Sequence, residues 1–272
     1  MAKIEFTKAV ASGNDFIVLD IFKKNKSFDR QNYSSLSKLL CERKFSIGAD
    51  GLLVLEPSSK ADFKMRIINP DGSEASMCGN GSRCAALYAY VEKIAKKTMS
   101  IETLAGNLFV KLENHNIRVN MTQPRDIKKN FKIKLNGHSI KANFINTGVE
   151  HVVCFMNSID NIDVKKLGSA IRYHRIFSPR GTNANFVKVI NASTIEVRTY
   201  ERGVEDETFS CGTGATASAI ISALLGKTKP PVNVSTKAKN KLKIYFDLNG
   251  QAVKNVFLEG TAKIVYNGKI EI

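Results

Sequence analysis

The chain has 272 residues, of which 43% are hydrophobic and 24% charged, the proportions of a globular protein and not of a disordered one. That length allows one large domain or two of about 130 residues, each able to bury its own core. No apolar run reaches the roughly 18 residues of a membrane span, and the opening MAKIEFTKAV carries charged groups where a signal peptide needs an apolar stretch. The sequence therefore predicts a cytoplasmic protein without a membrane partner.

The formal net charge is +16, from 41 lysines and arginines against 25 aspartates and glutamates. Such a charge is compatible with nucleic-acid binding, but the lysines are spread thinly, with mild concentrations at 128–141 and 227–243. The second segment is interpreted as a loop leading into a strand with Lys239, Lys241 and Lys243 on one face. Because aromatic residues do not alternate with the lysines, we expect a solvated basic surface and no nucleic-acid partner. A nucleic-acid-binding module stays as the alternative from another functional class.

The 5 cysteines are an odd number, and in a reducing compartment they are expected to be thiols. No pair of them has the close Cys/His spacing of a zinc site, and the 4 histidines are scattered. We therefore expect no metal.

In chain order, apolar runs bounded by glycine and aspartate predict strands at 16–20 and 52–55, and the alternation in KMRII predicts a half-buried strand at 65–68. After Cys78, the segment SRCAALYAYVEKIAKK has small and apolar residues at helical spacing. The later segment ATASAIISALLGK is apolar nearly all round and ends at Gly226, a helix stop. A helix without a polar face has to be enclosed, so we expect a sheet wrapped around it. The strands expected beyond the two helices lie at 101–112, 114–121, 241–248, 254–260 and 261–268.

Four short segments recur in the same order later in the chain, each displaced by 132 to 135 residues. The pairs are GNDFIV (13–18) with GVEHVV (148–153), GADGLLV (48–54) with GTNANFV (181–187), MRI (65–67) with VRT (197–199), and MCGNG (77–81) with SCGTG (210–214). Four chance matches would not share one register, so the chain consists of two homologous halves.

These elements predict an α/β (α+β) fold of two pseudo-symmetric domains, each a mostly antiparallel sheet rolled around a central helix. The active site is expected in the cleft between them. We place the first domain at 1–120 and the second at 121–262, and expect the tail 263–272 to pack back onto the first.

Each half places a cysteine, Cys78 or Cys211, at the entrance to its helix and follows it with Gly-x-Gly. The positive end of the helix dipole stabilises a thiolate at that position. The glycines let a ligand approach the backbone, and the free N–H groups of the first turn can hold a carboxylate. The remaining cysteines (Cys41, Cys84 and Cys154) lack such a counterpart and are interpreted as packing residues.

Paired thiols of this kind suit the inversion of an amino-acid α-carbon. A proton has to leave one face of the carbon and another has to arrive at the opposite face, and a single base tends to return the proton to the face that it came from. A thiolate and a thiol on opposite faces exchange these roles with the direction of reaction. Donors on the carboxylate stabilise the carbanionic transition state, so no cofactor is expected.

The segments NPDGSEASMCGNGSRCAA and YERGVEDETFSCGTGATA closely resemble the two signature stretches of diaminopimelate epimerases, and GNDF, IGADGLL and GTNANF resemble further blocks of that family. The resemblance covers essentially the whole chain. It implies interconversion of LL- and meso-diaminopimelate, a late step of lysine and peptidoglycan-precursor synthesis, with an amino acid as the small-molecule substrate. It also implies the two-domain fold and favours a homodimer.

By this resemblance the catalytic cysteines are Cys78 and Cys211. The reacting carboxylate is expected on the backbone of Gly79, Asn80, Gly212 and Thr213, and His151 matches a histidine close to the cysteine pair. The distal end of the substrate is expected to contact polar groups of both signs, namely Asn14, Asn69, Asn183, Glu201 and Arg202. For Glu201 and Arg202 to reach one site, the strand has to bend, which Gly203 permits.

The chain departs from the family pattern at Val149 and Glu150, where many members have Asn-Pro or Val-Pro, and at Gly51, where some have glutamine. These departures concern recognition of the distal end and not the cysteines. The alternatives on the same fold are a racemase or epimerase of another amino acid, as in proline racemases, and phenazine-pathway isomerases. The former typically carry histidine where this chain has Asn80, and the latter lack the cysteine pair. A catalytically inactive relative is a further alternative, disfavoured by the two intact motifs.

Overall fold

The computed structural model describes residues 3–22, 32–114, 116–135 and 138–272. The chain divides into two compact units, the first comprising Met1–Val119 with Gly260–Ile272 and the second Asn120–Glu259. No helix within the described ranges is long and apolar enough to cross a membrane.

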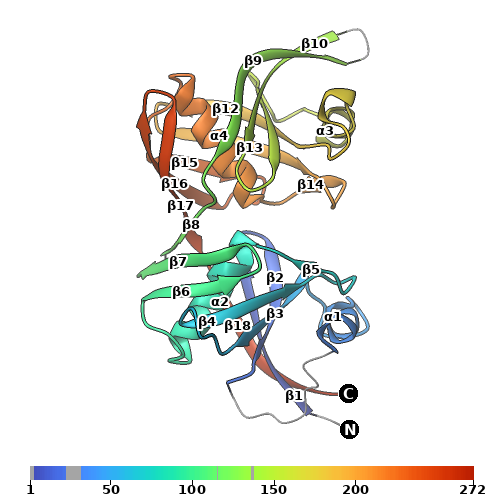
Figure 1. Cartoon of the computed structure of the whole chain (residues 1–272). Coiled ribbons are helices and arrows are strands. Elements are labelled where there is room, and N and C mark those ends of the chain that lie inside the picture. Colours follow the sequence, from blue (N-terminus) through green and yellow to red (C-terminus); the bar gives the residue numbers. More distant parts are fainter. Residues whose placement is uncertain (1–2, 23–31, 115, 136–137) are drawn as a thin grey trace. The chain divides into compact units, whose positions relative to one another are not determined.

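The first unit is built on a mixed sheet of strands labelled in Figure 1. Its strands are β1 (Lys3–Ala11), β2 (Asn14–Asp20), β3 (Gly51–Glu56), β4 (Phe63–Ile68), β5 (Glu74–Ala75), β6 (Thr98–Thr103), β7 (Gly106–Glu113), β8 (Asn116–Asn120) and β18 (Lys263–Glu271). β1 pairs antiparallel with β2 and with β18, so the last strand of the chain completes the sheet that the first strand begins. The β2–β3 and β4–β6 pairs are parallel, and the β3–β4, β4–β5, β6–β7 and β7–β8 pairs are antiparallel.

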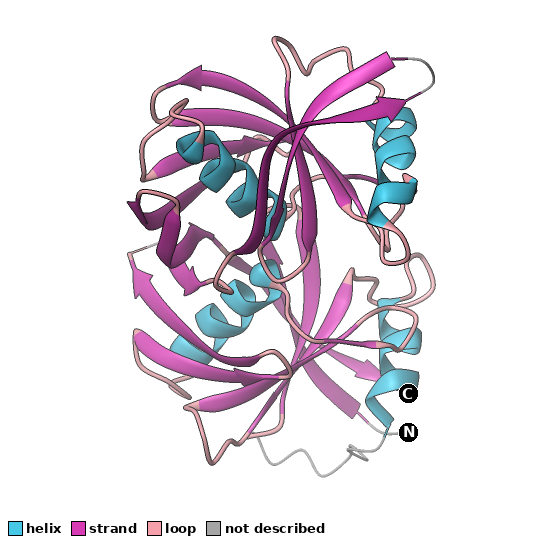
Figure 2. Ribbon diagram, turned by 45° about the horizontal axis from the view of Figure 1, so that its top comes forward, coloured by secondary structure: helices cyan, strands magenta, loops and turns pink. Residues whose placement is uncertain are grey.

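Among the described residues, the first unit contains the α-helices α1 (Tyr33–Cys41) and α2 (Gly79–Val91). α2 contacts β1, β2, β3, β4, β7 and β18, and its residues are buried on nearly every side. Its small residues explain how strands approach it all round, since Ala85, Ala86 and Ala89 are fully buried in the core. α2 is the enclosed helix of this unit (Figure 2).

The second unit repeats this arrangement with its own strands. They are β9 (Arg125–Leu135), β10 (His138–Asn146), β11 (Glu150–Phe155), β12 (Asn183–Asn191), β13 (Thr194–Glu201), β14 (Asp206–Thr208), β15 (Val232–Thr236), β16 (Lys241–Asn249) and β17 (Ala252–Thr261). The β11–β12 and β13–β15 pairs are parallel. The β9–β10, β10–β11, β12–β13, β13–β14, β15–β16 and β16–β17 pairs are antiparallel.

The helices of the second unit are α3 (Val164–Arg172) and α4 (Gly212–Leu224), with a short 3-10 helix, η2, at Arg175–Phe177. α4 contacts β10, β11, β12, β13, β15 and β16 and is buried from Gly214 to Ala223. The sequence-based argument that an apolar helix has to be enclosed is therefore confirmed for α4.

The two units share the same order and direction of strand pairs. β2–β3 corresponds to β11–β12, and β4–β6 corresponds to β13–β15, each pair parallel. An ion pair recurs as well: Arg66 binds Glu74 through Nε and Nη2, and Arg198 binds Glu207 in the same way. The predicted mixed α/β fold of two repeated halves is confirmed.

Several described elements were not predicted. The sequence analysis assigned no strand to the segments of β1, β5, β9, β10 and β14, and the single strand expected at 101–112 is divided into β6 and β7 by a turn at Leu104 and Ala105. α1 and α3 lie in segments for which the sequence analysis assigned no helix. β15 (Val232–Thr236) lies in the segment interpreted as a loop, because its buried residues Val232 and Val234 alternate with partly exposed ones over only five positions, a short signal between lysines.

Candidate active site

Cys78 occupies the N-cap position of α2 in the first unit. Its sulfur accepts a hydrogen bond from the N–H of Gly81 at 3.3 Å, and its carbonyl receives the N–H of Ser82 at 2.8 Å. Among the described residues, no acceptor contacts the N–H groups of Gly79 and Asn80, as expected for the first positions of a helix. The thiol therefore lies beside backbone donors that an anion can use.

The side chain of Asn80 is held by a buried arginine. Arg83, fully buried in α2, donates from Nη2 to Asn80 Oδ1 at 2.8 Å and to Ser12 Oγ at 2.7 Å, and from Nη1 to the Gly79 carbonyl at 3.2 Å. Burial lowers the pKa of Arg83 to about 10, which leaves it charged near neutrality. Arg83 was not predicted, although a lone arginine three residues after Asn80 on a small-residue helix signals a buried contact.

Asn14 completes a polar chain in the same unit. Asn80 Nδ2 donates to Asn14 Oδ1 at 2.6 Å, and Asn14 Nδ2 donates to Asp50 Oδ2 at 3.0 Å. The neighbouring Asp15 forms ion pairs with Lys8 and Arg43. Burial alone would raise the pKa of Asp15, but hydrogen bonds and charge from Arg43 and Lys8 hold it below the usual range.

Asn69 immediately follows β4 and closes a turn. Its Nδ2 donates to Ser73 Oγ at 3.0 Å and its N–H to the Ser73 carbonyl at 2.8 Å. In the sequence repeat, Asn69 corresponds to Glu201, which is likewise at the end of the corresponding strand.

Cys211 is the N-cap residue of α4 in the second unit. Its sulfur accepts from the N–H of Gly214 at 3.4 Å and lies 3.3 Å from the hydroxyl of Thr213. Glu201 is the last residue of β13, and burial raises its pKa above the usual value, an effect that the nearby Thr208 hydroxyl and Cys211 thiol only partly offset. This unit therefore pairs its thiol with a carboxyl group of weakened acidity.

His151 is fully buried in β11 with two different surroundings for its ring nitrogens. Nδ1 lies 3.1 Å from the amide nitrogen of Asn185, whereas Nε2 is buried without a partner among the described residues. The Asn185 amide also donates to the Val152 carbonyl at 2.9 Å and accepts from Thr199 at 2.9 Å. Burial, with a contribution from the charge of Arg202, lowers the pKa of His151 to about 3, so the ring is neutral. Donation from Asn185 to Nδ1 places the ring proton on Nε2.

Asn185 lies within the matched segment GTNANF, and the sequence analysis predicts no role for it. Its importance follows from the tertiary position of Gly214, where a Cβ atom would stand 2.4 Å from Asn185 Oδ1. In the sequence, the position of Asn185 within a matched segment is the one indication that this residue has a role.

Arg202 lies in the turn after β13 and forms a cluster with Glu150 and Asn183. Its Nη1 donates to Glu150 Oε2 at 2.8 Å, and its backbone N–H donates to Asn183 Oδ1 at 2.8 Å. Asn183 Nδ2 donates to the Glu150 carbonyl at 2.8 Å. Glu201 and Arg202 thus face different neighbours, and Gly203 with a φ of 96° provides the bend after them.

A family model and relatives of known name match this chain over most of its length. The family model described as diaminopimelate epimerase matches residues 6–127 and 143–265, one stretch in each half. Curated relatives named diaminopimelate epimerase include those of Hydrogenobaculum sp. (strain Y04AAS1), 41% identical with 97% of each chain covered, and of Aquifex aeolicus (strain VF5), 41% identical with 98% of each chain covered. The protein of that name from Caldanaerobacter subterraneus is 42% identical, covering 99% of this chain and 100% of its own.

The chain belongs to the diaminopimelate epimerase family.

Two solved structures have a similar fold. A Bacillus anthracis phenazine biosynthesis protein of the PhzF family has a TM-score of 0.76 at 17% identity, covering 100% of both chains. A probable proline racemase from Agrobacterium radiobacter K84 has a TM-score of 0.72 at 14% identity, covering 99% of this chain and 93% of that one. These likenesses concern the fold alone.

The other three cysteines are buried free thiols. Burial raises the pKa of Cys41 and Cys84, and raises that of Cys154 to about 12. A raised pKa keeps each thiol protonated and unreactive near neutrality. Their surroundings agree with the interpretation of these cysteines as packing residues.

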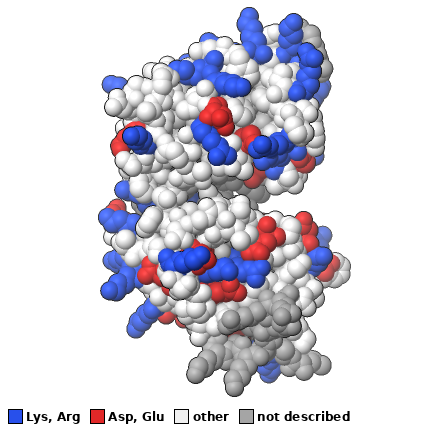
Figure 3. Space-filling view, viewed as in Figure 1, with Lys and Arg blue, Asp and Glu red and all other residues white. Residues whose placement is uncertain are grey.

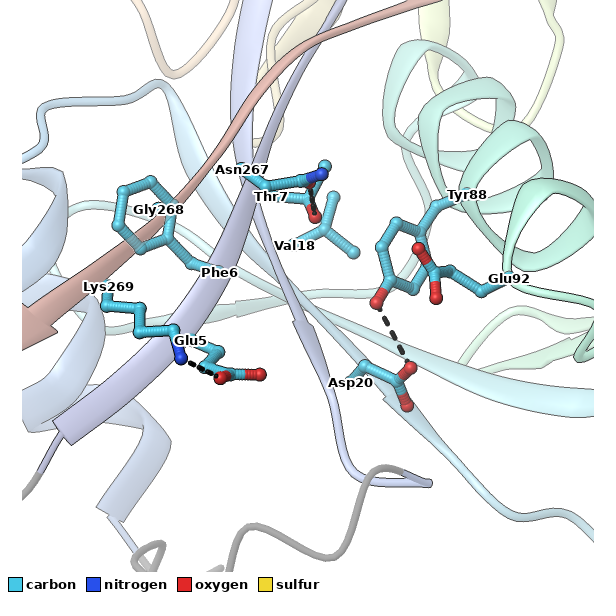
Figure 4. A pocket seen from close by; sticks show the side chains of 10 residues that line it. All are labelled: Glu5, Phe6, Thr7, Val18, Asp20, Tyr88, Glu92, Asn267, Gly268 and Lys269. Atoms are coloured by element: carbon cyan, nitrogen blue, oxygen red, sulfur yellow. Dashed lines mark hydrogen bonds and ion pairs between the residues drawn. The ribbon is translucent and has the colours of Figure 1, made fainter.

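A separate hollow of about 280 Å³ lies in the first unit, and Figure 4 shows the side chains that line it. The Tyr88 hydroxyl points to Asp20 and donates to it at 3.0 Å, while Lys269 pairs with Glu5 at 2.7 Å. None of the predicted site residues lines this hollow. The hollow is therefore distinct from the candidate active site.

Proposed function

We propose that the chain interconverts LL- and meso-2,6-diaminopimelate through Cys78 and Cys211, acting on opposite faces of one α-carbon. The observation that carries the proposal is the position of both thiols. Each is the N-cap of its unit's enclosed helix, with the first backbone N–H groups of that helix beside it. Membership of an isomerase family with this substrate in its name supports the reaction.

The proposed reaction begins with one cysteine as thiolate. That sulfur removes the α-proton, and the negative charge that develops on the substrate is stabilised by donors on its carboxylate, drawn from Gly79, Asn80, Gly212 and Thr213. The opposite cysteine donates its proton to the other face, which leaves it as the thiolate. Reversal of the roles gives the reverse reaction, and no cofactor takes part in these steps.

Two further groups are proposed to manage protons near the thiols. Glu201 interacts with Cys211 and has a raised pKa, which suits a carboxyl that exchanges a proton with a thiol. His151 is neutral and presents its Nε2 proton without a partner, which suits a donor to a group brought by the substrate or the other thiol.

The distal end of the substrate is proposed to bind in contact with Asn14, Asn69, Asn183 and Arg202. A guanidinium presents a planar fork that matches a carboxylate. Asn183 also accepts a hydrogen bond from the Arg202 backbone N–H and donates one to the Glu150 carbonyl, so it holds the backbone beside that fork in place.

The deciding experiment is solvent deuterium incorporation by NMR, with LL-diaminopimelate and freshly reduced protein in D₂O. We expect meso product with deuterium at the inverted α-carbon. In Cys78→Ala and Cys211→Ala, we expect inversion to fall by at least about 10³-fold, because each removes one of the two proton carriers. Cys84→Ala, a buried thiol in the same helix as Cys78, is the matched control and should keep the activity within about threefold.

Other outcomes would redirect or reject the proposal. Exchange with proline or another amino acid, but not with diaminopimelate, would keep the two-thiol chemistry and remove the substrate. Absence of exchange with any amino acid would contradict the proposed role of the paired cysteines.

The proposal extends to the protein's setting. The reaction belongs to lysine and peptidoglycan-precursor synthesis, and we propose that it takes place in the cytoplasm. We also propose a homodimer, for which light scattering after size exclusion should give about twice the 30.0 kDa chain mass.

A further inference from the structure

The guanidinium of Arg202 is engaged on one side only. Its Nη1 donates to Glu150 Oε2 at 2.8 Å, to the Arg180 carbonyl at 3.2 Å and to the Gly181 carbonyl at 3.4 Å. Over the ranges that the structure describes, no acceptor contacts its Nε or Nη2. The edge formed by Nε and Nη2 is therefore open to a carboxylate.

The same edge is occupied in two other arginines of this chain. Arg66 binds Glu74 through Nε and Nη2 at 2.8 and 2.7 Å, and Arg198 binds Glu207 through the same atoms at 2.7 and 2.9 Å. This geometry is the bidentate one that arginine prefers for carboxylates. Nε and Nη2 of Arg202 can thus bind a carboxylate in the same bidentate way, while Nη1 donates to Glu150.

Glu150 is fixed beside Arg202 by the backbone as well as by its charge. Asn183, only 3% exposed, donates to the Glu150 carbonyl and accepts from the Arg202 N–H, each at 2.8 Å. The side chains of Glu150 and Arg202 are 15% and 24% exposed, so their pair is largely shielded from solvent. The second contact of Glu150, with Arg180 at 3.4 Å, involves a side chain that is 76% exposed and therefore contributes little.

A ligand carboxylate on the open edge of Arg202 would meet a negative charge close by. Glu150 lies on the same guanidinium, so it repels a second carboxylate and attracts a neighbouring ammonium. A ligand end that carries both groups satisfies Arg202 with its carboxylate and Glu150 with its ammonium. A ligand end that carries a carboxylate alone leaves two anions on one guanidinium.

We propose that Glu150 is a specificity-determining residue that, with Arg202, selects substrates whose distal end is a zwitterionic amino acid over those with a distal carboxylate alone. This inference rests on the proposed function, in which Arg202 receives the distal carboxylate.

The test compares two ligands that differ only in the distal ammonium. LL-diaminopimelate is the substrate, and L-2-aminopimelate, which lacks that ammonium, is measured as a competitive inhibitor. Glu150→Gln retains an oxygen for Arg202 but removes the charge. We expect the ratio of the aminopimelate Ki to the diaminopimelate KM to fall about tenfold in Glu150→Gln, with kcat changed less than threefold.

Two further variants separate this role from a structural one. Glu150→Asp keeps the charge and should retain most of the wild-type ratio. Glu196→Gln removes the same charge from β13, where Glu196 Oε2 lies 3.9 Å from Lys188 Nζ, and should leave the ratio unchanged. A general loss of folding would lower the activity of Glu150→Gln without changing the ratio of the two constants.

The outcomes distinguish the inference from the function on which it rests. Wild-type turnover with the same ratio in Glu150→Gln overturns the role of Glu150 alone. A lack of diaminopimelate turnover in the wild type overturns the proposed function, and the role of Glu150 with it.

Discussion

The residues around His151 determine the tautomer and the protonation state of its imidazole. The donor from Asn185 fixes the tautomer, and complete burial lowers the pKa to about 3 from an ordinary 6.5. Since the ring nitrogen Nε2 has no partner in the part of the chain that the structure describes, the residue is expected to be held in place at some cost in stability. Such a cost is typical of groups kept for binding or catalysis.

The stability of the protein should depend on pH through His151. The folded-state pKa is lower than the unfolded one, so between pH 6.5 and about 3 the unfolded chain binds more protons. Stability present above pH 6.5 is therefore lost as the pH falls, by up to about 1.4 kcal/mol per pH unit.

Urea unfolding at pH 7 and pH 5 measures this effect. Between these pH values the wild type should lose about 2 kcal/mol more than His151→Gln, in which the titrating group is absent. Carboxylates that titrate in this range are the same in both proteins and cancel in the comparison. Equal losses would show that His151 is not held neutral in the folded chain.

At the scale of the element, the glycines in the first turns of α2 and α4 differ in how much space surrounds them. A Cβ atom at Gly214 would stand 2.4 Å from Asn185 Oδ1, and one at Gly81 would stand 3.1 Å from Leu53 Cδ2. At Gly79 a Cβ atom would meet nothing within 4 Å. At Gly212 it would stand 3.2 Å from Leu258 Cδ1. Gly214 is thus required by packing, whereas the space beside Gly79 is available to a ligand.

Alanine substitutions should distinguish a packing role of Gly214 from a ligand-binding role of Gly79. Gly214→Ala should lower the free energy of unfolding by about 3 kcal/mol, because Asn185 is fully buried and hydrogen-bonded and has no room to move. Gly79→Ala should leave stability within about 0.5 kcal/mol but raise the KM for diaminopimelate by about tenfold or more, because its methyl group would occupy the proposed carboxylate position. Thermal denaturation and steady-state kinetics check both, and an unchanged KM in Gly79→Ala would place the carboxylate elsewhere.

At the scale of the whole molecule, basic and acidic side chains are mixed over much of the visible surface, although basic ones predominate at the upper end of the view in Figure 3. Figure 3 shows lysine and arginine atoms interspersed with acidic ones on the face that it presents. Many of the basic side chains form ion pairs, as Lys165 does with Asp206 and Lys237 with Glu207. Part of the basic charge is thus balanced locally, and we expect the net charge of +16 to act as a diffuse positive field.

Oligonucleotide binding should accordingly be weak and nonspecific. Fluorescence anisotropy with two unrelated labelled oligonucleotides should give equal affinities that fall steeply between about 50 and 200 mM salt. Tight binding that resists salt and depends on base sequence would contradict this expectation and restore a nucleic-acid role.

The sequence by itself determined the repeat, the mixed α/β fold and the family. Periodicity and matched segments report these features because each half obeys the same pattern of burial over about 130 residues. The enclosure of α4 followed from its lack of a polar face, and the bend after Arg202 followed from Gly203. α1 and α3 escaped prediction because their buried faces are short, with only Val164, Gly168 and Ile171 buried in α3.

Only the tertiary structure decided which polar groups meet. Side-chain contacts join Arg83 to Ser12, Asn185 to His151, and Glu150 to Arg202. Ser12 and Arg83 are 71 residues apart in the chain, and Glu150 and Arg202 are 52 apart. Local patterns depend on neighbours within a few positions, whereas hydrogen bonds and ion pairs of this kind depend on which strands and turns are brought side by side.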